Sequence, residues 1–194
     1  QVGYLITIVP MGALSDRYSP RWVIAGGAAG TGVASLLFGI IAEGFVLGTI
    51  LRFIAGGFMA GVYVPGMRFI SDWYPSGVRG KALGIYVGAY SFSSGLAFVV
   101  GSQVTALVDW ETAIIVTSVG AVLSAPAIVL FAKDVAGREQ RQTKWLDLSV
   151  LRNPGYLYSV AIYTLHAWEL FGVRNWILVF LVAVPVFASG AAPV

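Results

Sequence analysis

Four ionisable side chains interrupt otherwise apolar stretches of the sequence: Arg52, His166, Glu169 and Arg174. Ionisable residues inside a membrane span are costly, and they usually mark substrate or proton pathways. His166 and Glu169 are three residues apart, so they share a face of a helix. That pair suits a proton relay, a substrate contact or a hydrogen bond between helices. Two arginines against one glutamate favour an anionic solute, or an acidic partner elsewhere in the protein.

A second group of polar side chains follows within another apolar stretch. Tyr86 and Tyr90 are one helical turn apart, and with Ser91, Ser93 and Ser94 they could line a polar cavity. Tyr86, Tyr90 and the four ionisable residues are therefore the candidate contacts to a substrate or a proton.

Catalytic chemistry has little support in these residues. A serine nucleophile needs a base and an orienting group, and the sequence has no G-x-S-x-G motif. A metal site needs more ligands than His166 and Glu169, and no H-E-x-x-H cluster occurs. Cysteine is absent, which excludes disulfides and thiolate ligands. We therefore expect that the protein is not an enzyme, has no catalytic residue and binds neither a metal nor a cofactor.

The stretches that must position these residues are long and apolar. Of 194 residues, 58% are hydrophobic and only 11% are charged, which is outside the range of soluble domains. Five stretches are long enough for a transmembrane helix of about 20 residues, and residues 1–14 suit the end of another. The five stretches are 22–42, 44–67, 82–108, 112–132 and 155–184. We expect an all-α bundle of transmembrane helices.

Lys and Arg are distributed unevenly between the loops. Alternating spans put residues 15–21, 70–81 and 133–153 on one side, where ten of the twelve basic residues lie, with Arg68 at the edge. The loops of the other side carry only acids: Glu43, Asp109 and Glu111. The positive-inside rule makes the first side cytoplasmic, and in bacteria the membrane would be the inner membrane. The basic residues therefore belong to membrane loops and do not indicate nucleic-acid binding.

Opposite charges at the cytoplasmic loops can pair across the ends of neighbouring helices. Asp16, Arg17 and Arg21 on the first loop are expected to face Asp72 and Arg79 on the next. Such pairs would hold the cytoplasmic side closed in one state and break in another. The alternative is a loose surface cluster worth about 0–1 kcal/mol per pair.

Three segments resemble signatures of the major facilitator superfamily. Residues 12–21, GALSDRYSPR, resemble the G-x-L-A-D-R-x-G-R-R motif between its second and third helices, although Ser19 and Pro20 depart from it. Residues 52–60 resemble its fourth-helix pattern of Arg, then Gly four residues later. Residues 74–82 resemble the next loop, with Val78 where an acid is common. The last span is similar to a bacterial branch of the superfamily.

The resemblance implies a secondary transporter that moves a small solute by alternating access, with or without a proton. It covers the end of the second helix through the seventh, about six of twelve helices. The implied domains are an N-terminal bundle over 1–132, truncated at its start, a cytoplasmic linker over 133–154, and the first helix of a C-terminal bundle with its following loop over 155–194. Its partners would be the bilayer, the solute and the remainder of the transporter, with no nucleic acid. The implied gate residues are Gly12, Asp16, Arg17, Arg21, Asp72 and Arg79.

The alternative class is a membrane-embedded enzyme or receptor of unknown ligand. It would require a catalytic constellation or a ligand-sensing domain, and the sequence shows neither. The linker contains Trp145, Leu148 and Leu151 at helical spacing, which predicts a short helix in the membrane interface.

Overall fold

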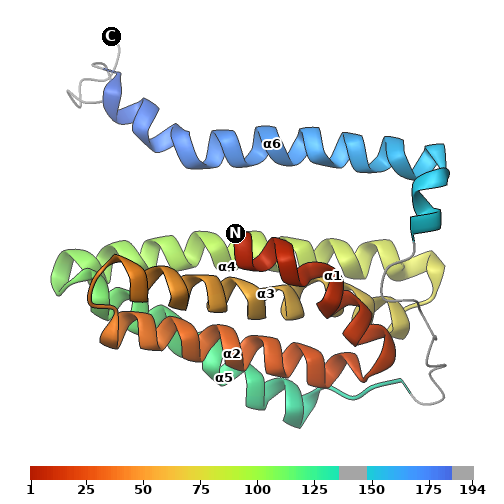
Figure 1. Cartoon of the computed structure of the whole chain (residues 1–194), viewed down its shortest axis with the longest axis horizontal. Coiled ribbons are helices and arrows are strands. Elements are labelled where there is room, and N and C mark those ends of the chain that lie inside the picture. Colours follow the sequence, from red (N-terminus) through yellow and green to blue (C-terminus); the bar gives the residue numbers. More distant parts are fainter. Residues whose placement is uncertain (136–147, 185–194) are drawn as a thin grey trace. The chain divides into compact units, whose positions relative to one another are not determined.

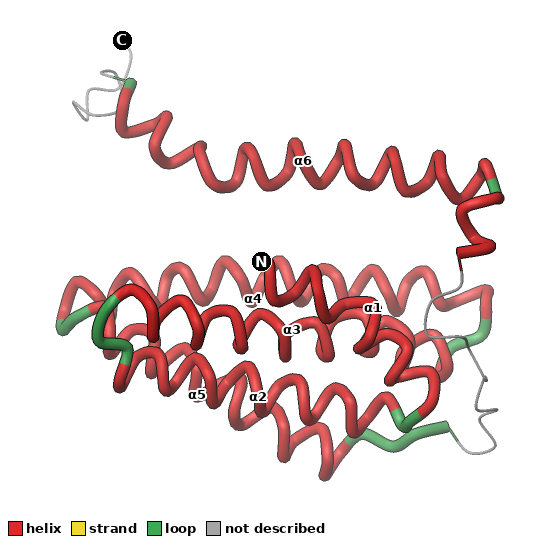
Figure 2. The backbone as a smooth tube through the Cα atoms, in the orientation of Figure 1, coloured by secondary structure: helices red, strands yellow, loops and turns green. Residues whose placement is uncertain are grey.

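The computed structural model describes residues 1–135 and 148–184, and in these ranges every regular element is a helix (Figures 1 and 2). The expected all-α fold is therefore confirmed. The α-helices of the described residues are α1 Val2–Arg17, α2 Pro20–Ile41, α3 Phe45–Trp73, α4 Ser76–Leu107, α5 Trp110–Phe131 and α6 Pro154–Ala183, with a 3₁₀ helix η1 Leu148–Arg152. The chain forms two compact units, residues 1–146 with α1 to α5 and residues 147–194 with η1 and α6.

Helices α2, α3, α4 and α5 are long and apolar enough to cross a membrane. With 29 and 32 residues, α3 and α4 extend about 44 and 48 Å at 1.5 Å per residue. Helix α6 has 30 residues, so its length also suffices, and its crossing of the membrane stays a prediction. Most of the expected linker 133–154 lies outside the described residues, as does Trp145 of the expected interfacial helix; residues 148–152 form η1.

The turns between helices are shorter than predicted. Helix α1 continues through Asp16 and Arg17, and only Tyr74 and Pro75 separate α3 from α4. The predicted loops 15–21 and 70–81 are therefore wrong in extent, because polar residues at helix ends resemble loop residues. Proline marks the true turns: the residue before a proline avoids the α conformation, and proline itself suits a helix start. Tyr74 accordingly is extended, with φ −114° and ψ 129°.

Helix α2 is at the centre of the first unit, between α3 and α5, while α1 packs on α3 and α4 packs chiefly on α5. Most buried apolar side chains in this unit are small, such as Ala28, Ala34 and Ala60. Large apolar side chains point outward instead, and none of the residues of α4 is buried. This inside-out distribution suits a bundle surrounded by lipid, where small residues let helices approach closely.

Glycines make the closest contacts between these helices. A Cβ atom added at Gly27 of α2 would lie 2.9 Å from the carbonyl carbon of Gly61 in α3, and one at Gly32 would lie 2.7 Å from the amide nitrogen of Val122 in α5. Both distances are shorter than a Cβ atom tolerates. Glycine at these two positions therefore sets the spacing of α2 from both of its neighbours.

Only some of the glycines in these helices lie against a neighbouring helix. Gly27 lies against the backbone of α3, and Gly30 lies against the ring of Phe58. Around Gly26, Gly84 and Gly88, by contrast, no described atom beyond the adjoining residues and backbone of their own helix comes within 4 Å of an added Cβ. Spacing alone could not separate these two groups, because glycine is frequent throughout membrane helices.

Two threonines add hydrogen bonds inside the bundle. Thr7 Oγ1 of α1 donates to the carbonyl oxygen of Gly57 in α3 at 2.8 Å. Thr31 Oγ1 of α2 donates within its own helix to Gly27 at 2.7 Å and lies 3.4 Å from the carbonyl oxygen of Ala55 in α3. Such bonds between helices in lipid contribute about 0.6–2 kcal/mol each.

The antiparallel helices give the first unit two chemically different ends (Figure 1). The basic end consists of the α1–α2 turn, the α3–α4 turn and residues 132–135 after α5. The acidic end consists of the α2–α3 and α4–α5 turns and carries Glu43, Asp109 and Glu111. There Asp109 caps α5 by accepting a hydrogen bond from the Thr112 amide at 2.6 Å. That bond holds the pKa of Asp109 below its usual value.

We predict that Gly27→Ala destabilises the protein that contains this chain by about 1–3 kcal/mol, because a methyl group there forces α2 and α3 apart. Gly26→Ala is the matched control, since it adds the same methyl group to the neighbouring position of the same helix. We expect it to leave stability unchanged or slightly raised. Thermal unfolding in detergent measures both variants, and equal losses would contradict the close approach of Gly27 to Gly61.

Candidate functional site

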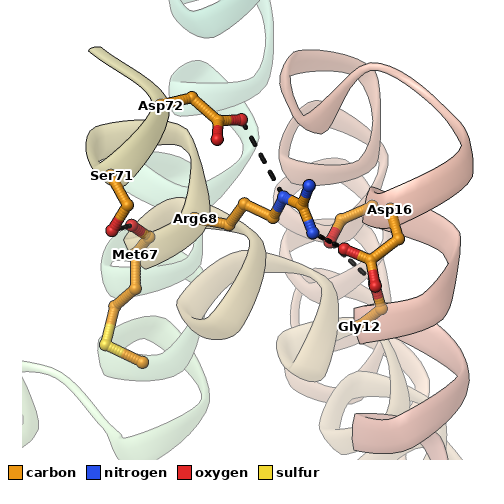
Figure 3. A network of polar contacts seen from close by, with 7 residues as sticks. Gly12, Asp16, Met67, Arg68, Ser71 and Asp72 are labelled. Atoms are coloured by element: carbon orange, nitrogen blue, oxygen red, sulfur yellow. Dashed lines mark hydrogen bonds and ion pairs between the residues drawn. The ribbon is translucent and has the colours of Figure 1, made fainter. Parts of the chain in front are cut away.

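Arg68, near the end of α3, joins two helices at the basic end of the first unit (Figure 3). Its Nη1 forms an ion pair with Asp16 Oδ1 of α1, and its Nε lies 3.8 Å from Asp72 Oδ2, one turn further along α3. We call Asp16, Arg68 and Asp72 the Arg68 triad. The three side chains are only 24%, 20% and 28% exposed for Arg68, Asp16 and Asp72 respectively. They interact more strongly than a fully exposed surface pair would.

The positions of the triad residues in their helices explain why their pairing is favourable. Asp16 lies in the last turn of α1, where the helix dipole disfavours a negative charge. Arg68 offsets that cost from the neighbouring helix. Arg68 and Asp72 are four residues apart on α3, which places them on one face. Gly12 lies one turn before Asp16, and its carbonyl oxygen accepts a hydrogen bond from Ser15 at 2.8 Å.

The triad differs in one respect from the pairing expected from the sequence. Asp16 and Asp72 do come together, but they share Arg68, which the sequence analysis placed only at the edge of a loop. Arg79 donates from Nε to the backbone carbonyl oxygen of Tyr74 at 3.2 Å. The i, i+4 spacing of Arg68 and Asp72 at the end of an apolar helix was the available signal. Arg17 lies beside Asp16 in the last turn of α1.

Arg21 also has a partner that the sequence analysis did not predict. Its Nη2 donates to the backbone carbonyl oxygen of Val129, in the last turn of α5, and its guanidinium lies 5.3 Å from the centroid of the Trp22 ring. The last carbonyl groups of a helix have no partner within it, so a cation there is favourable. Arg21 lies in the first turn of α2, and α2 packs on α5, so the contact of its guanidinium is with α5.

Two further contacts fasten the chain after α5 to the same end. Ser19 Oγ donates to Asp134 Oδ2, and Trp73 Nε1 donates to the backbone carbonyl oxygen of Lys133 at 2.9 Å. The basic end therefore contains two polar clusters. The Arg68 triad joins α1 to α3, and the second cluster joins the start of α2 and the end of α3 to residues 129–134.

Arg52 lies near the acidic end, beside a cavity of about 460 Å³. Its guanidinium carbon is 3.8 Å from the centroid of the Phe38 ring of α2, which is close enough for a cation–π interaction. The cavity is lined mainly by apolar and small residues, including Phe45, Gly48 and Phe53. Among the described residues no carboxylate forms an ion pair with Arg52, and its guanidinium lies over an aromatic ring instead.

Tyr86 and Tyr90 of α4 form an aromatic cluster with Tyr63 of α3. The Tyr63 ring stacks on Tyr86 with centroids 6.0 Å apart and lies 5.8 Å from Tyr90. The Tyr86 hydroxyl approaches the carbonyl oxygens of Val62 and Tyr63 at 3.4 Å, over Gly66, where any side chain would collide with it. Tyr86 thus joins α3 to α4, while Tyr90 is 42% exposed. Tyr63 was missed because only helix packing brings it to them.

In the second unit, α6 carries the remaining candidates. His166 Nδ1 lies 3.8 Å from Glu169 Oε2, so the two side chains share a face as expected. Both are mostly exposed within their own unit, at 64% and 71%. Arg174 follows five residues after Glu169 on the same helix. Across the described ranges, no three His, Cys, Asp or Glu side chains gather closely enough to hold a metal ion.

Comparison with known proteins identifies the family of the chain. It is 27% identical to Protein spinster of Drosophila melanogaster over 90% of this chain and 30% of that protein. It is 28% identical to Protein spinster homolog 1 of Rattus norvegicus over 92% of this chain and 36% of that protein. It is 27% identical to the Glycerol-3-phosphate transporter of Bacillus subtilis (strain 168) over 64% of this chain and 29% of that protein.

The chain thus spans about a third of the length of these relatives. The family model described as the Major Facilitator Superfamily matches residues 1–192, nearly the whole chain. The expectation drawn from the motifs of residues 12–21, 52–60 and 74–82 is thereby confirmed. This chain belongs to the Major Facilitator Superfamily.

Proposed function

We propose that this chain is part of a secondary transporter that moves a small solute across a membrane by alternating access, and that it is not an enzyme. The observation that carries the proposal is the Arg68 triad, in which one guanidinium has two carboxylate acceptors on different helices. If the Asp16 carboxylate moves away from Arg68, the guanidinium can still pair with the Asp72 carboxylate. The contact between α1 and α3 can therefore open without leaving the cation unpaired, which keeps two states close in free energy.

In this proposal the triad works as a gate at one face of the membrane. Release from Arg68 makes the Asp16 carboxylate available to a group outside the first unit. The remainder of the transporter would supply that group, and Asp16 would thereby couple the first bundle to the second. Arg17 and Arg79 are further basic residues of this end, and Gly12, Arg17, Arg21 and Arg79 complete the proposed gate region.

The basic end is proposed to face the cytoplasm. Ten of the twelve Lys and Arg residues belong to segments on that side of the alternating spans, and the acidic end carries none. Orientation follows the excess of basic residues in short loops. The relevant membrane would be the inner membrane in a bacterium.

The solute is proposed to be an anion. Arg52 is a permanent cation beside a cavity in an apolar bundle, and within the described residues it has an aromatic ring and no carboxylate as its partner. A planar guanidinium can bind a carboxylate or phosphate through two parallel hydrogen bonds. The Bacillus subtilis relative is named for glycerol-3-phosphate, a phosphate ester, which is in keeping with this class of solute.

The proposed site predicts that Arg52→Lys lowers transport of an anionic probe about tenfold or more, because Lys keeps the charge but loses the planar fork. Glycerol-3-phosphate is the probe, and uptake is measured in proteoliposomes containing the full-length protein. Arg152→Lys, an exposed exchange of the same chemistry in η1, is the matched control and should transport normally. Wild-type uptake in both Arg52→Lys and Arg52→Ala would exclude Arg52 from the solute pathway.

Glu169 is proposed to carry a co-transported proton, with His166 as its neighbour. Glu169→Gln removes the titrating group and keeps its shape, so we expect transport that no longer changes with external pH, while solute binding remains measurable. The measurement is uptake and equilibrium binding across a pH series. If Glu169→Gln keeps the wild-type pH profile, Glu169 does not carry the proton, and His166 and Glu169 serve only in contacts between helices.

A further inference from the structure

A basic and aromatic surface forms where the α3–α4 turn meets the chain after α5. We call Trp73, Tyr74, Arg79, Lys81 and Lys133 the basic–aromatic patch. Two hydrogen bonds join four of these residues: Trp73 Nε1 donates to the carbonyl oxygen of Lys133 at 2.9 Å, and Arg79 Nε donates to that of Tyr74 at 3.2 Å. Lys81 follows Arg79 by two residues near the start of α4. The first bond joins segments that are distant in the sequence, so the patch is built by the fold.

The side chains of the patch are open to their surroundings. Trp73 and Tyr74 are 49% and 47% exposed, and Arg79, Lys81 and Lys133 are also exposed. Trp and Tyr combine an apolar ring with a polar group, and they concentrate at the level of lipid headgroups. Three exposed cations and two such rings, all at the same end of membrane-length helices, match the layer in which lipid phosphates lie.

The three cations of the patch make no ion pair among the described residues. The two nearest acids in the sequence are Asp72, which lies 3.8 Å from Arg68, and Asp134, which accepts a hydrogen bond from Ser19. Within the described residues no carboxylate forms an ion pair with Arg79, Lys81 or Lys133. The three cations of the patch are therefore not engaged in ion pairs within the described part of the chain.

We propose that the basic–aromatic patch binds the headgroup of an anionic phospholipid in the leaflet at the basic end. Lys81 and Lys133 contact the phosphate, and the rings of Trp73 and Tyr74 lie beside the glycerol region. Basic clusters at membrane helix ends attract anionic lipid, whereas a zwitterionic headgroup brings a cation that the patch repels. Binding of this lipid is independent of the transported solute.

The test counts bound lipid on the detergent-purified full-length protein by native mass spectrometry, during titration with phosphatidylglycerol or phosphatidylcholine. Wild type should prefer phosphatidylglycerol. Lys81→Gln and Lys133→Gln should each weaken phosphatidylglycerol binding about fivefold, and the double variant about 25-fold. The double variant with both lysines changed to Arg should keep the preference, and thermal unfolding monitors the folding of every variant.

Arg152→Gln removes an exposed cation of the other unit and is the matched control; we expect less than about a twofold change in binding. Excess inorganic phosphate should not displace the lipid. The proposal is overturned if wild type binds the two lipids equally, if the double Gln variant binds like wild type, if Arg152→Gln weakens binding as much as Lys81→Gln, or if phosphate displaces the lipid.

Discussion

The ion pair between Arg68 and Asp16 holds the basic ends of α1 and α3 together, and the other charged residues of this end are arranged around it. A carboxylate at the end of α1 is disfavoured by its own helix, and a cation at the end of an apolar helix needs an acceptor. Pairing satisfies both. Arg21 donates instead to a carbonyl oxygen in the last turn of α5, so the described residues of the basic end form two separate polar clusters. One of these, the triad, has an alternative arrangement available, since Asp72 is a second acceptor for Arg68.

Lipid imposes the second constraint on this fold. Apolar side chains gain nothing by leaving lipid for another helix, so the helices must be held by close backbone packing and a few polar contacts. Gly27 and Gly32 provide the packing around α2, and Thr7 and Thr31 provide hydrogen bonds. With so few polar contacts, changing one at a helix end can shift the balance between two arrangements, which is what a gate requires.

The sequence was sufficient to predict the helices and the family, because long apolar runs and the motif of residues 12–21 are local signals. It was insufficient for the pairing of side chains. Arg68 meets Asp16 only because α1 packs on α3. Arg21 bonds to a backbone carbonyl oxygen, and every residue type has one, so the sequence cannot indicate this partner. Tyr63 likewise joins Tyr86 and Tyr90 through helix packing. The turns were predicted too long because the apolar part of each helix ends before the helix itself does. Pro20 and Pro75 mark the actual boundaries.

The central claim is that Asp16 acts through Arg68, and a double-mutant cycle tests it most directly. Transport and folded yield would be measured for Asp16→Asn, Arg68→Gln and the double variant of the full-length protein. If the two side chains act as a pair, each single variant loses transport with little loss of yield. The double variant then loses no more than either single variant, giving a coupling free energy of about 0.5–3 kcal/mol. Losses that multiply in the double variant would show that Asp16 and Arg68 act independently, and would contradict the account.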